Sequence, residues 1–154
     1  MLRTVPVRSE SLPPRVARCF RAIDSMDADA LASFFAAGAA VRLPGVSPII
    51  GATAISKAFV QFCLEVDELH HDPVLLWIAG DLSVLEADVK VTLTDHTTIA
   101  FPATYTIRWA ASLIQEADVN IYLESRVAVA MSAFYRLRSA GRETRRRRSA
   151  RPMS

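Results

Sequence analysis

The sequence predicts one α+β domain in which a curved, mostly antiparallel β-sheet wraps around three N-terminal helices. Up to about residue 66, apolar side chains recur at steps of three and four, as in amphipathic helices. Beyond that point they alternate with polar ones in runs rich in β-branched and aromatic residues, as in strands. A chain of 154 residues, 51% apolar and 22% charged, suffices for a single core. We expect a flexible N-terminus at 1–10, the single domain at 11–138 and a disordered arginine-rich tail at 139–154.

Two short helices open the domain. Pro13 and Pro14 suit the start of the first, because a helix does not use the N–H that proline lacks there, and its apolar stripe runs to about Ser25. Asp27 offers an N-cap oxygen to the second, which we expect to end at Gly38. Their apolar stripes comprise Val16, Cys19, Phe20 and Ile23 in the first helix, and Leu31, Phe34 and Phe35 in the second.

A brief strand at 41–44 and a loop at 45–51 lead to the third helix, which we expect from about Thr53. Its apolar stripe contains Ile55, Phe59, Phe62, Cys63 and Val66. After Glu124, the sequence leaves open whether the chain ends in a last helix or a strand.

Four long strands, at about 69–79, 82–95, 98–110 and 112–124, form an antiparallel meander. Their alternation predicts an apolar inner face with Leu85, Ala87, Val89, Val91, Phe101, Tyr105, Trp109 and Val119, and a polar outer face with Glu86, Asp88, Lys90, Arg108, Glu116 and Asp118. Three short helices do not fill a twisted, curved sheet, so we expect an apolar pocket on the inner face.

The charge distribution, the two cysteines and the lack of a membrane-spanning run indicate the surface charge and the cellular location of the protein. Residues 136–154 carry eight arginines against one glutamate, so the body is acidic although the whole chain has a net charge of +2. Cys19 and Cys63 lie in predicted helices without metal-ligand spacing, and we interpret both as buried thiols. With no membrane-spanning run and no signal peptide at the N-terminus, we expect a cytoplasmic protein.

The order of these elements resembles the cone-shaped fold of the nuclear transport factor two-like superfamily, in its SnoaL-like and ketosteroid-isomerase-like branch. The resemblance is carried by Asp27-x-Asp29-Ala30-Leu31-x-x-Phe34-Phe35-Ala36, by Ala40 to Pro44, by Gly51-x-x-Ala54-Ile55 and by Ile107-Arg108-Trp109. It spans about residues 14–124 and implies a SnoaL-like or cystatin-like α+β barrel. Because this fold hosts many chemistries, the function must come from the residues of the site.

The catalytic residues of the family are not matched. The resemblance would put the general-base aspartate of a ketosteroid isomerase at Leu43, and the two donors that hold its enolate at Cys19 and Tyr105. Tyr105 can still donate a hydrogen bond, whereas a thiol is a poor donor. The Arg-x-Asp pattern of limonene epoxide hydrolases falls at Glu86 and Asp88, and the inner face lacks the aspartate of SnoaL-like cyclases. We therefore expect neither a standard ketosteroid isomerase nor an epoxide hydrolase.

Other polar residues offer alternatives. His70, His71 and Asp72 are adjacent on a strand, so the two imidazoles point to opposite faces and cannot chelate one ion, but one of them can line the pocket as a base. Asp24, near the end of the first helix, can point into the mouth of the cone. The carboxylates of the outer face can form a cluster or simply face water.

These residues predict a pocket for a small apolar or polycyclic molecule, without a metal or cofactor. The protein either carries this molecule or turns it over weakly, as an isomerase, cyclase or lyase, with Tyr105 as the catalytic candidate. The predicted ligand-binding residues are Cys19, Phe20, Phe35, Leu43, Phe59, Cys63, Trp77, Val89, Tyr105, Trp109 and Val119.

The alternative is a non-catalytic interaction module with a basic tail that tethers an acidic partner or nucleic acid. No aromatic residue interleaves with Arg145 to Arg148, which argues against nucleic acid. For either function we expect a homodimer formed through the outer face of the sheet, because closed twofold pairs are the commonest oligomers.

Overall fold

The structure is a computed structural model that describes residues 3–6 and 11–122, within a compact unit that ends at Tyr122. The segment after Glu124, the end of the predicted domain and the tail at 139–154 lie outside the described residues. The elements are β1 (Arg3–Pro6), α1 (Pro14–Asp24), α2 (Ala28–Ala32), β2 (Phe35–Arg42), β3 (Ile49–Ile50), α3 (Ala52–Cys63), β4 (Val66–Ala79), β5 (Leu82–Leu93), β6 (Thr98–Ala110) and β7 (Leu113–Ile121).

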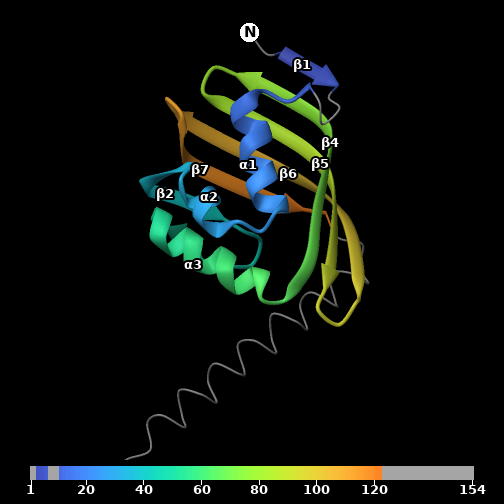
Figure 1. Cartoon of the computed structure of the whole chain (residues 1–154). Helices are drawn as coiled ribbons and strands as arrows, with labels where there is room; N and C mark the ends of the chain where they lie inside the picture. Colours follow the sequence, from blue (N-terminus) through green and yellow to red (C-terminus); the bar gives the residue numbers. More distant parts are fainter. Residues whose placement is uncertain (1–2, 7–10, 123–154) are drawn as a thin grey trace, which may run out of the picture. The chain divides into compact units, whose positions relative to one another are not determined.

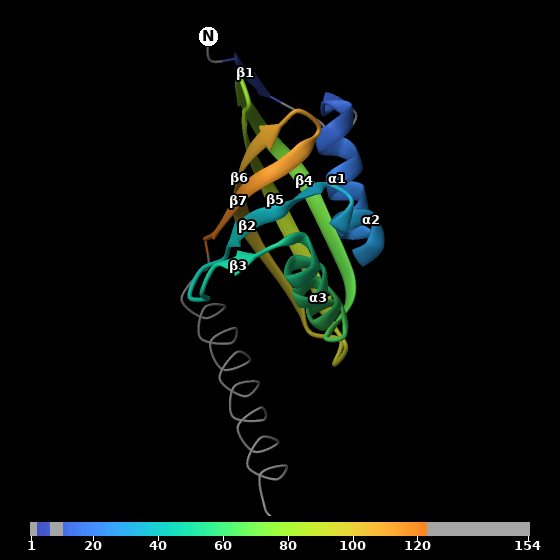
Figure 2. The same cartoon turned by 90° about the vertical axis from the view of Figure 1, so that its left-hand side faces the viewer.

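Within the described residues, the seven strands form one sheet in the order β1-β4-β5-β6-β7-β2-β3. The predicted meander of β4 to β7 is confirmed, and every pairing is antiparallel except that of β2 with β7. The three helices lie on one side of the sheet, which curves around them (Figures 1 and 2). The α+β fold expected from the sequence is confirmed.

The second helix is shorter than predicted. Asp27 caps α2 as expected, since its carboxylate accepts a hydrogen bond from the N–H of Ala30 at 3.0 Å. The helix ends at Ala32, however, and the chain from Phe35 forms β2 instead of helix up to Gly38. β2 pairs along β7. Without this pairing, β7 would have unpaired backbone groups at the edge of the sheet, so the pairing outweighs the local helix propensity of residues 35–38.

Two further segments differ from the prediction. Residues 3–6, expected in a flexible N-terminus, form β1 on the edge of β4. Ile49 and Ile50, expected in a loop, form the short strand β3 on β2. β1 has four residues and β3 has two, which is too short for an alternation of apolar and polar side chains to indicate a strand.

The assignment of the sheet faces is confirmed for β5. Leu85, Ala87, Val89 and Val91 are buried under the helices, while Asp88 and Lys90 are exposed on the other side. The apolar core joins α1, α2 and α3 to the inner face of the sheet. It contains Val16, Cys19, Phe20, Leu31, Ile55, Leu76, Leu85, Ile107, Trp109 and Ile114.

Trp77 lies on the outer face, so the prediction that it lines an inner pocket is wrong. β4 contains a bulge between Pro73 and Leu75, where an extra residue shifts the alternation by one. Beyond it Leu76 pairs with the buried Leu85, and Trp77 pairs with Val84 of the outer row. Proline has no N–H to give to the ladder, which suits Pro73 to this irregular position.

Candidate active site

Three side chains from distant parts of the chain meet on the inner face of the sheet. The ring Nδ1 of His71 lies 2.5 Å from Oδ1 of Asp24, and its Nε2 lies 2.5 Å from the hydroxyl of Tyr105. The backbone N–H of His71 also donates to Oδ2 of Asp24, at 3.1 Å. Asp24, His71 and Tyr105, called the triad below, thus form one continuous line of hydrogen bonds.

Each member of the triad comes from a different element. Asp24 is the last residue of α1, at the helix end where the macrodipole disfavours a negative charge. Its place there is explained by the two hydrogen bonds that it accepts from His71. His71 lies on β4 and Tyr105 on β6, so the two rings reach toward each other across β5.

Small residues on β5 and β6 make room for this contact. The register pairs His71 with Val89 and Tyr105 with Leu85, so that Ala87 lies between them on the inner face of β5, opposite Ala103. Both alanines are buried, at 2% and 1% exposure. Strands two apart in a sheet are about 10 Å from each other, which an imidazole and a phenol together can bridge over an alanine.

Phe20 of α1 packs against both rings. Its centroid lies 5.2 Å from that of His71 and 4.9 Å from that of Tyr105, with edge-to-face angles of 69° and 82°. Edge-to-face contacts are a favoured geometry for aromatic pairs. The helix that provides Asp24 therefore also fixes the ring planes of His71 and Tyr105, through Phe20.

The hydrogen bonds assign the protons of the triad. An ionised carboxylate only accepts hydrogen bonds, so the nitrogen that faces Asp24 carries a proton. In a neutral imidazole Nε2 is then an acceptor, and the hydroxyl of Tyr105 donates to it. Burial, and after it the negative charge of Asp24, raise the pKa of the Tyr105 hydroxyl above its ordinary value. Tyr105 is therefore protonated at neutral pH.

The middle of the triad is shielded, whereas its ends are more open. The side chain of His71 is 3% exposed and that of Asp24 is 25% exposed. Tyr105 is half-buried at the border of the apolar cluster. A ligand on the inner face would therefore meet Tyr105 before it met the imidazole.

Apart from Trp77, the other predicted ligand-binding residues are either buried or half-buried. Cys19, Phe20, Val89 and Trp109 are buried, and the Trp109 ring N–H donates to the hydroxyl of buried Ser83 at 3.2 Å. Phe35, Leu43, Phe59 and Val119 are half-buried. Cys63, interpreted from the sequence as buried, is only half-buried at the end of α3.

Val119 and Leu43 continue, across β7 and the end of β2, the line of inner-face side chains that includes Tyr105. Val119 on β7 pairs with Tyr105, and the parallel register that sets Arg42 beside Asp118 brings Leu43, next along the chain, toward Val119. The position that the family resemblance gave to a general-base aspartate is therefore apolar and lies on the same side of the sheet as Tyr105. Polar chemistry at this place has to come from the triad.

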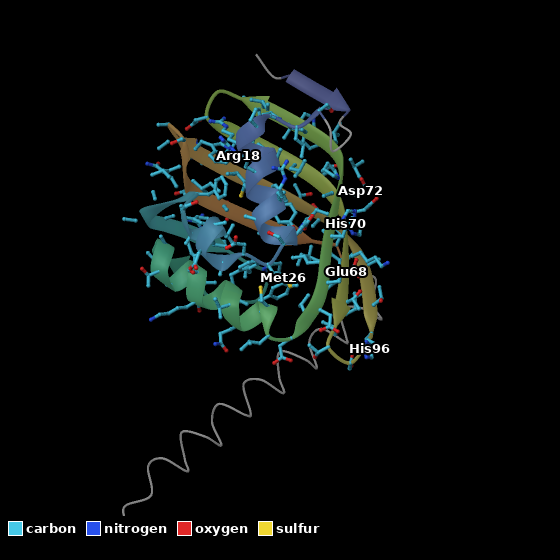
Figure 3. The ribbon with its side chains drawn as sticks, viewed as in Figure 1. Arg18, Met26, Glu68, His70, Asp72 and His96 are labelled. Atoms are coloured by element: carbon cyan, nitrogen blue, oxygen red, sulfur yellow. The ribbon has the colours of Figure 1, made fainter. Side chains whose placement is uncertain are left out.

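The outer face carries charges and a shallow hollow. His70 and Asp72, the strand neighbours of His71, are exposed on the outer side of β4, as expected from strand alternation (Figure 3). A depression of about 220 Å³ is lined by Val74, Glu86, Ala87, Asp88, Pro102, Ala103, Thr104 and Tyr122. It touches no member of the triad. Among the described residues, no group of three or more potential ligands is arranged to hold a metal ion.

The sequence pointed to each member of the triad singly and missed their convergence. Asp24 and His71 are 47 residues apart, and His71 and Tyr105 are 34 apart. Two signals were available: a carboxylate at the unfavourable end of a helix, and one histidine within an otherwise apolar row. Ser83, missed as the partner of Trp109, is likewise a polar residue in an apolar row.

Known structures share this fold. A hypothetical protein from Catenulispora acidiphila with a ketosteroid isomerase-like fold, in complex with trimethylamine, is 20% identical over 75% of this chain and 90% of its own, with a TM-score of 0.69. A putative polyketide cyclase from Sinorhizobium meliloti is 24% identical over 74% and 100%, with a TM-score of 0.62. A putative SnoaL-like polyketide cyclase from Shewanella denitrificans is 13% identical over 77% and 95%, with a TM-score of 0.68.

No curated protein sequence matches the chain. The family model of the SnoaL-like domain matches residues 16–117, which include the whole triad and most of the sheet. On this match and the fold, the protein belongs to the SnoaL-like domain family.

Proposed function

We propose that the protein binds a small apolar or polycyclic molecule on the inner face of the sheet and transfers protons to and from it through the triad. The observation that carries this proposal is the line of hydrogen bonds from Asp24 through His71 to the half-buried hydroxyl of Tyr105. A buried histidine held between a carboxylate and a phenol is the arrangement of a general acid–base catalyst. No cofactor is needed for such a reaction.

The proposed proton path runs through Tyr105. A C–H or O–H bond of the ligand breaks, its electron pair stays on the ligand, and the proton goes to the oxygen of Tyr105. The proton that Tyr105 held passes to Nε2 of His71 in the same step. Asp24 then faces an imidazolium, whose positive charge it stabilises. The reverse sequence returns a proton to another atom of the ligand, which is an isomerisation, or assists a cyclisation or elimination.

The surroundings of Tyr105 support an apolar ligand. Leu43 and Val119 are half-buried apolar residues on the same side of the sheet, and Phe59 of α3 packs against the same apolar core as Tyr105. A mostly apolar site with one or two polar groups is typical of pockets for small organic molecules. The likeness to proteins named as polyketide cyclases fits a cyclic ligand with a carbonyl or hydroxyl group.

Isothermal titration of a steroid, a hydroxynaphthoquinone and a monoterpene ketone tests the binding. We expect saturable binding of at least one, weakened about fivefold in Tyr105→Phe, because a typical hydrogen bond contributes about 1 kcal/mol. Tyr122→Phe is the matched control, since Tyr122 is 61% exposed on the other face of the sheet. A complete lack of saturable binding would contradict the proposal.

We also propose that the domain pairs with a second copy through the outer face of the sheet, in the cytoplasm. Val74, whose side chain is 49% exposed, lines the hollow on this face. Light scattering after gel filtration should give twice the chain mass, and Val74→Arg should give a monomer. A monomeric wild type would contradict this pairing. Among the described residues, no helix is long and apolar enough to cross a membrane.

A further inference from the structure

His71 and Tyr105 do not have enough N–H and O–H hydrogens to act as donors in all of their contacts at once. The Tyr105 hydroxyl has one hydrogen, and the imidazole of His71 carries one or two. Nδ1 uses its hydrogen on Asp24, and Nε2 faces the oxygen of Tyr105 at 2.5 Å. The number of protons on His71 therefore decides where the single hydrogen of Tyr105 points.

With a neutral His71, the hydrogen of Tyr105 is donated to Nε2. The oxygen then offers a ligand only lone pairs, so it accepts hydrogen bonds and cannot donate them. Turning the hydroxyl toward a ligand would leave Nε2 unpaired in a site where the imidazole is 3% exposed. A buried acceptor without a partner is costly, so this rotation is disfavoured.

With a protonated His71, the situation reverses. Nε2 becomes a donor to the oxygen of Tyr105, and the hydrogen of Tyr105 is free to be donated outward. The positive imidazolium polarises this hydroxyl, which makes it a stronger donor toward a carbonyl or an oxyanion.

Asp24 and Tyr105 are the titratable groups that contact the ring of His71, so its protonation is governed within the triad. From α1 the ring meets Asp24 and Phe20, and from β6 it meets Tyr105. Its β5 partner is Val89, next to Ala87 on the same face, and neither titrates. Cys19, a buried titratable residue of α1, stays a neutral thiol, because burial raises its pKa to about 12. His70 and Asp72 are exposed on the opposite face of the sheet.

We propose that one proton on His71 selects the ligand class of this site. The singly protonated imidazole binds ligands that donate a hydrogen bond to Tyr105, such as an enol or an N–H group. The doubly protonated imidazole binds ligands that accept one, such as a ketone or an enolate. This inference rests on the proposed function, since it concerns the same ligand site.

Three bicyclic molecules of nearly equal size separate the two states: indanone, which only accepts hydrogen bonds; indole, whose N–H donates; and indene, which does neither. Isothermal titration at a series of pH values between 5 and 8 measures how the binding of each molecule depends on pH. We expect the Kd of indanone to rise with pH and that of indole to fall, each by up to about tenfold per pH unit, as one linked proton requires. Indene should show no trend.

Variants locate the linked proton. Tyr105→Phe should remove both pH trends and leave the binding of indene, whereas Tyr122→Phe should leave all three ligands as in the wild type. Parallel trends for indanone and indole, or no trend for either, would overturn the inference while leaving the proposed binding function intact. Failure of all three to bind at any pH would contradict the proposed function itself.

A measurement without ligand tests the proton assignment directly. Nitrogen-15 NMR of the His71 ring should show the hydrogen on Nδ1 in the neutral form and on both nitrogens in the protonated form. A neutral His71 with its hydrogen on Nε2 would overturn the inference whatever the ligands do, because Tyr105 would then already be free to donate.

Discussion

The carboxylate of Asp24 accepts two hydrogen bonds from His71, one from its ring Nδ1 at 2.5 Å and one from its backbone N–H at 3.1 Å. The end of α1 is thus joined to the middle of β4 through a single residue. A carboxylate that contacts both the backbone and the ring fixes the ring plane as well as the proton on Nδ1.

Asp24→Asn should therefore disturb the triad more than the fold. An amide can accept from the backbone N–H, but its NH₂ group facing Nδ1 would favour the other tautomer of His71 and remove the charge that stabilises an imidazolium. We expect proton transfer to fall by about 10²-fold or more and the nitrogen-15 signals of His71 to change tautomer. Asp27→Asn is the control, because asparagine caps a helix as well as aspartate does. Equal effects of the two substitutions would contradict the role of Asp24.

Ala87→Leu should separate His71 from Tyr105. Ala87 lies between their positions on β5 and is 2% exposed, so a leucine would occupy the space in which the rings meet. We expect a loss of about 1–3 kcal/mol in the free energy of unfolding, measured with urea, together with loss of the His71 to Tyr105 contact in NMR. Ala100→Leu, on the exposed face of β6, should change stability by less than about 0.5 kcal/mol. An Ala87→Leu variant that keeps this contact would show that the alanine is not needed for it.

The faces of β5 and the positions of β4 to β7 could be predicted because alternation is a local signal that every residue of a strand repeats. The prediction for Trp77 failed where one inserted residue at the Pro73 bulge reversed that signal. Phe35 was placed in a helix because its pairing partner, Ile114 on β7, lies far along the sequence. The triad escaped prediction for the same reason: α1, β4 and β6 meet only in the folded sheet.

Ser83→Ala should destabilise the fold without touching the triad. Ser83 is 1% exposed and accepts a hydrogen bond from the ring N–H of Trp109, itself 2% exposed and stacked under the guanidinium of Arg15 at 4.6 Å. The substitution leaves a buried N–H without a partner, which costs about 1–3 kcal/mol in the free energy of unfolding. Ser47→Ala, in an exposed loop, is the control for urea unfolding. An unchanged midpoint for Ser83→Ala would mean that this bond contributes nothing.

Alkaline pH should destabilise the protein through two buried acids. Burial raises the pKa of Cys19 from 9.0 to about 12 and raises that of Tyr105 above its ordinary value. Both groups hold their protons more tightly when folded, so their contribution to stability is complete below pH 9. It is lost progressively as the pH rises from about 9 for Cys19 and from about 10 for Tyr105, at up to about 1.4 kcal/mol per pH unit for each group.

Urea unfolding between pH 7 and pH 11 measures this slope, which should be smaller in Cys19→Ala and in Tyr105→Phe than in the wild type. The comparison of slopes is independent of any constant loss of stability that the substitutions cause. If the free energy of unfolding of the wild type stays constant up to pH 11, the pKa values of Cys19 and Tyr105 are not raised by folding.

Deuterium exchange into tetralone tests the proposed proton transfer most directly, since this bicyclic ketone has exchangeable protons next to its carbonyl group. Such a proton can pass to Tyr105 only while His71 is singly protonated, because Nε2 must accept the proton that Tyr105 gives up. Proton NMR in D₂O should show exchange faster than in buffer alone, and Tyr105→Phe and His71→Gln should each reduce the catalysed rate by about 10²-fold or more. Tyr122→Phe should retain the wild-type rate. Exchange at the buffer rate in the wild type, or a full rate in Tyr105→Phe, would contradict proton transfer through the triad.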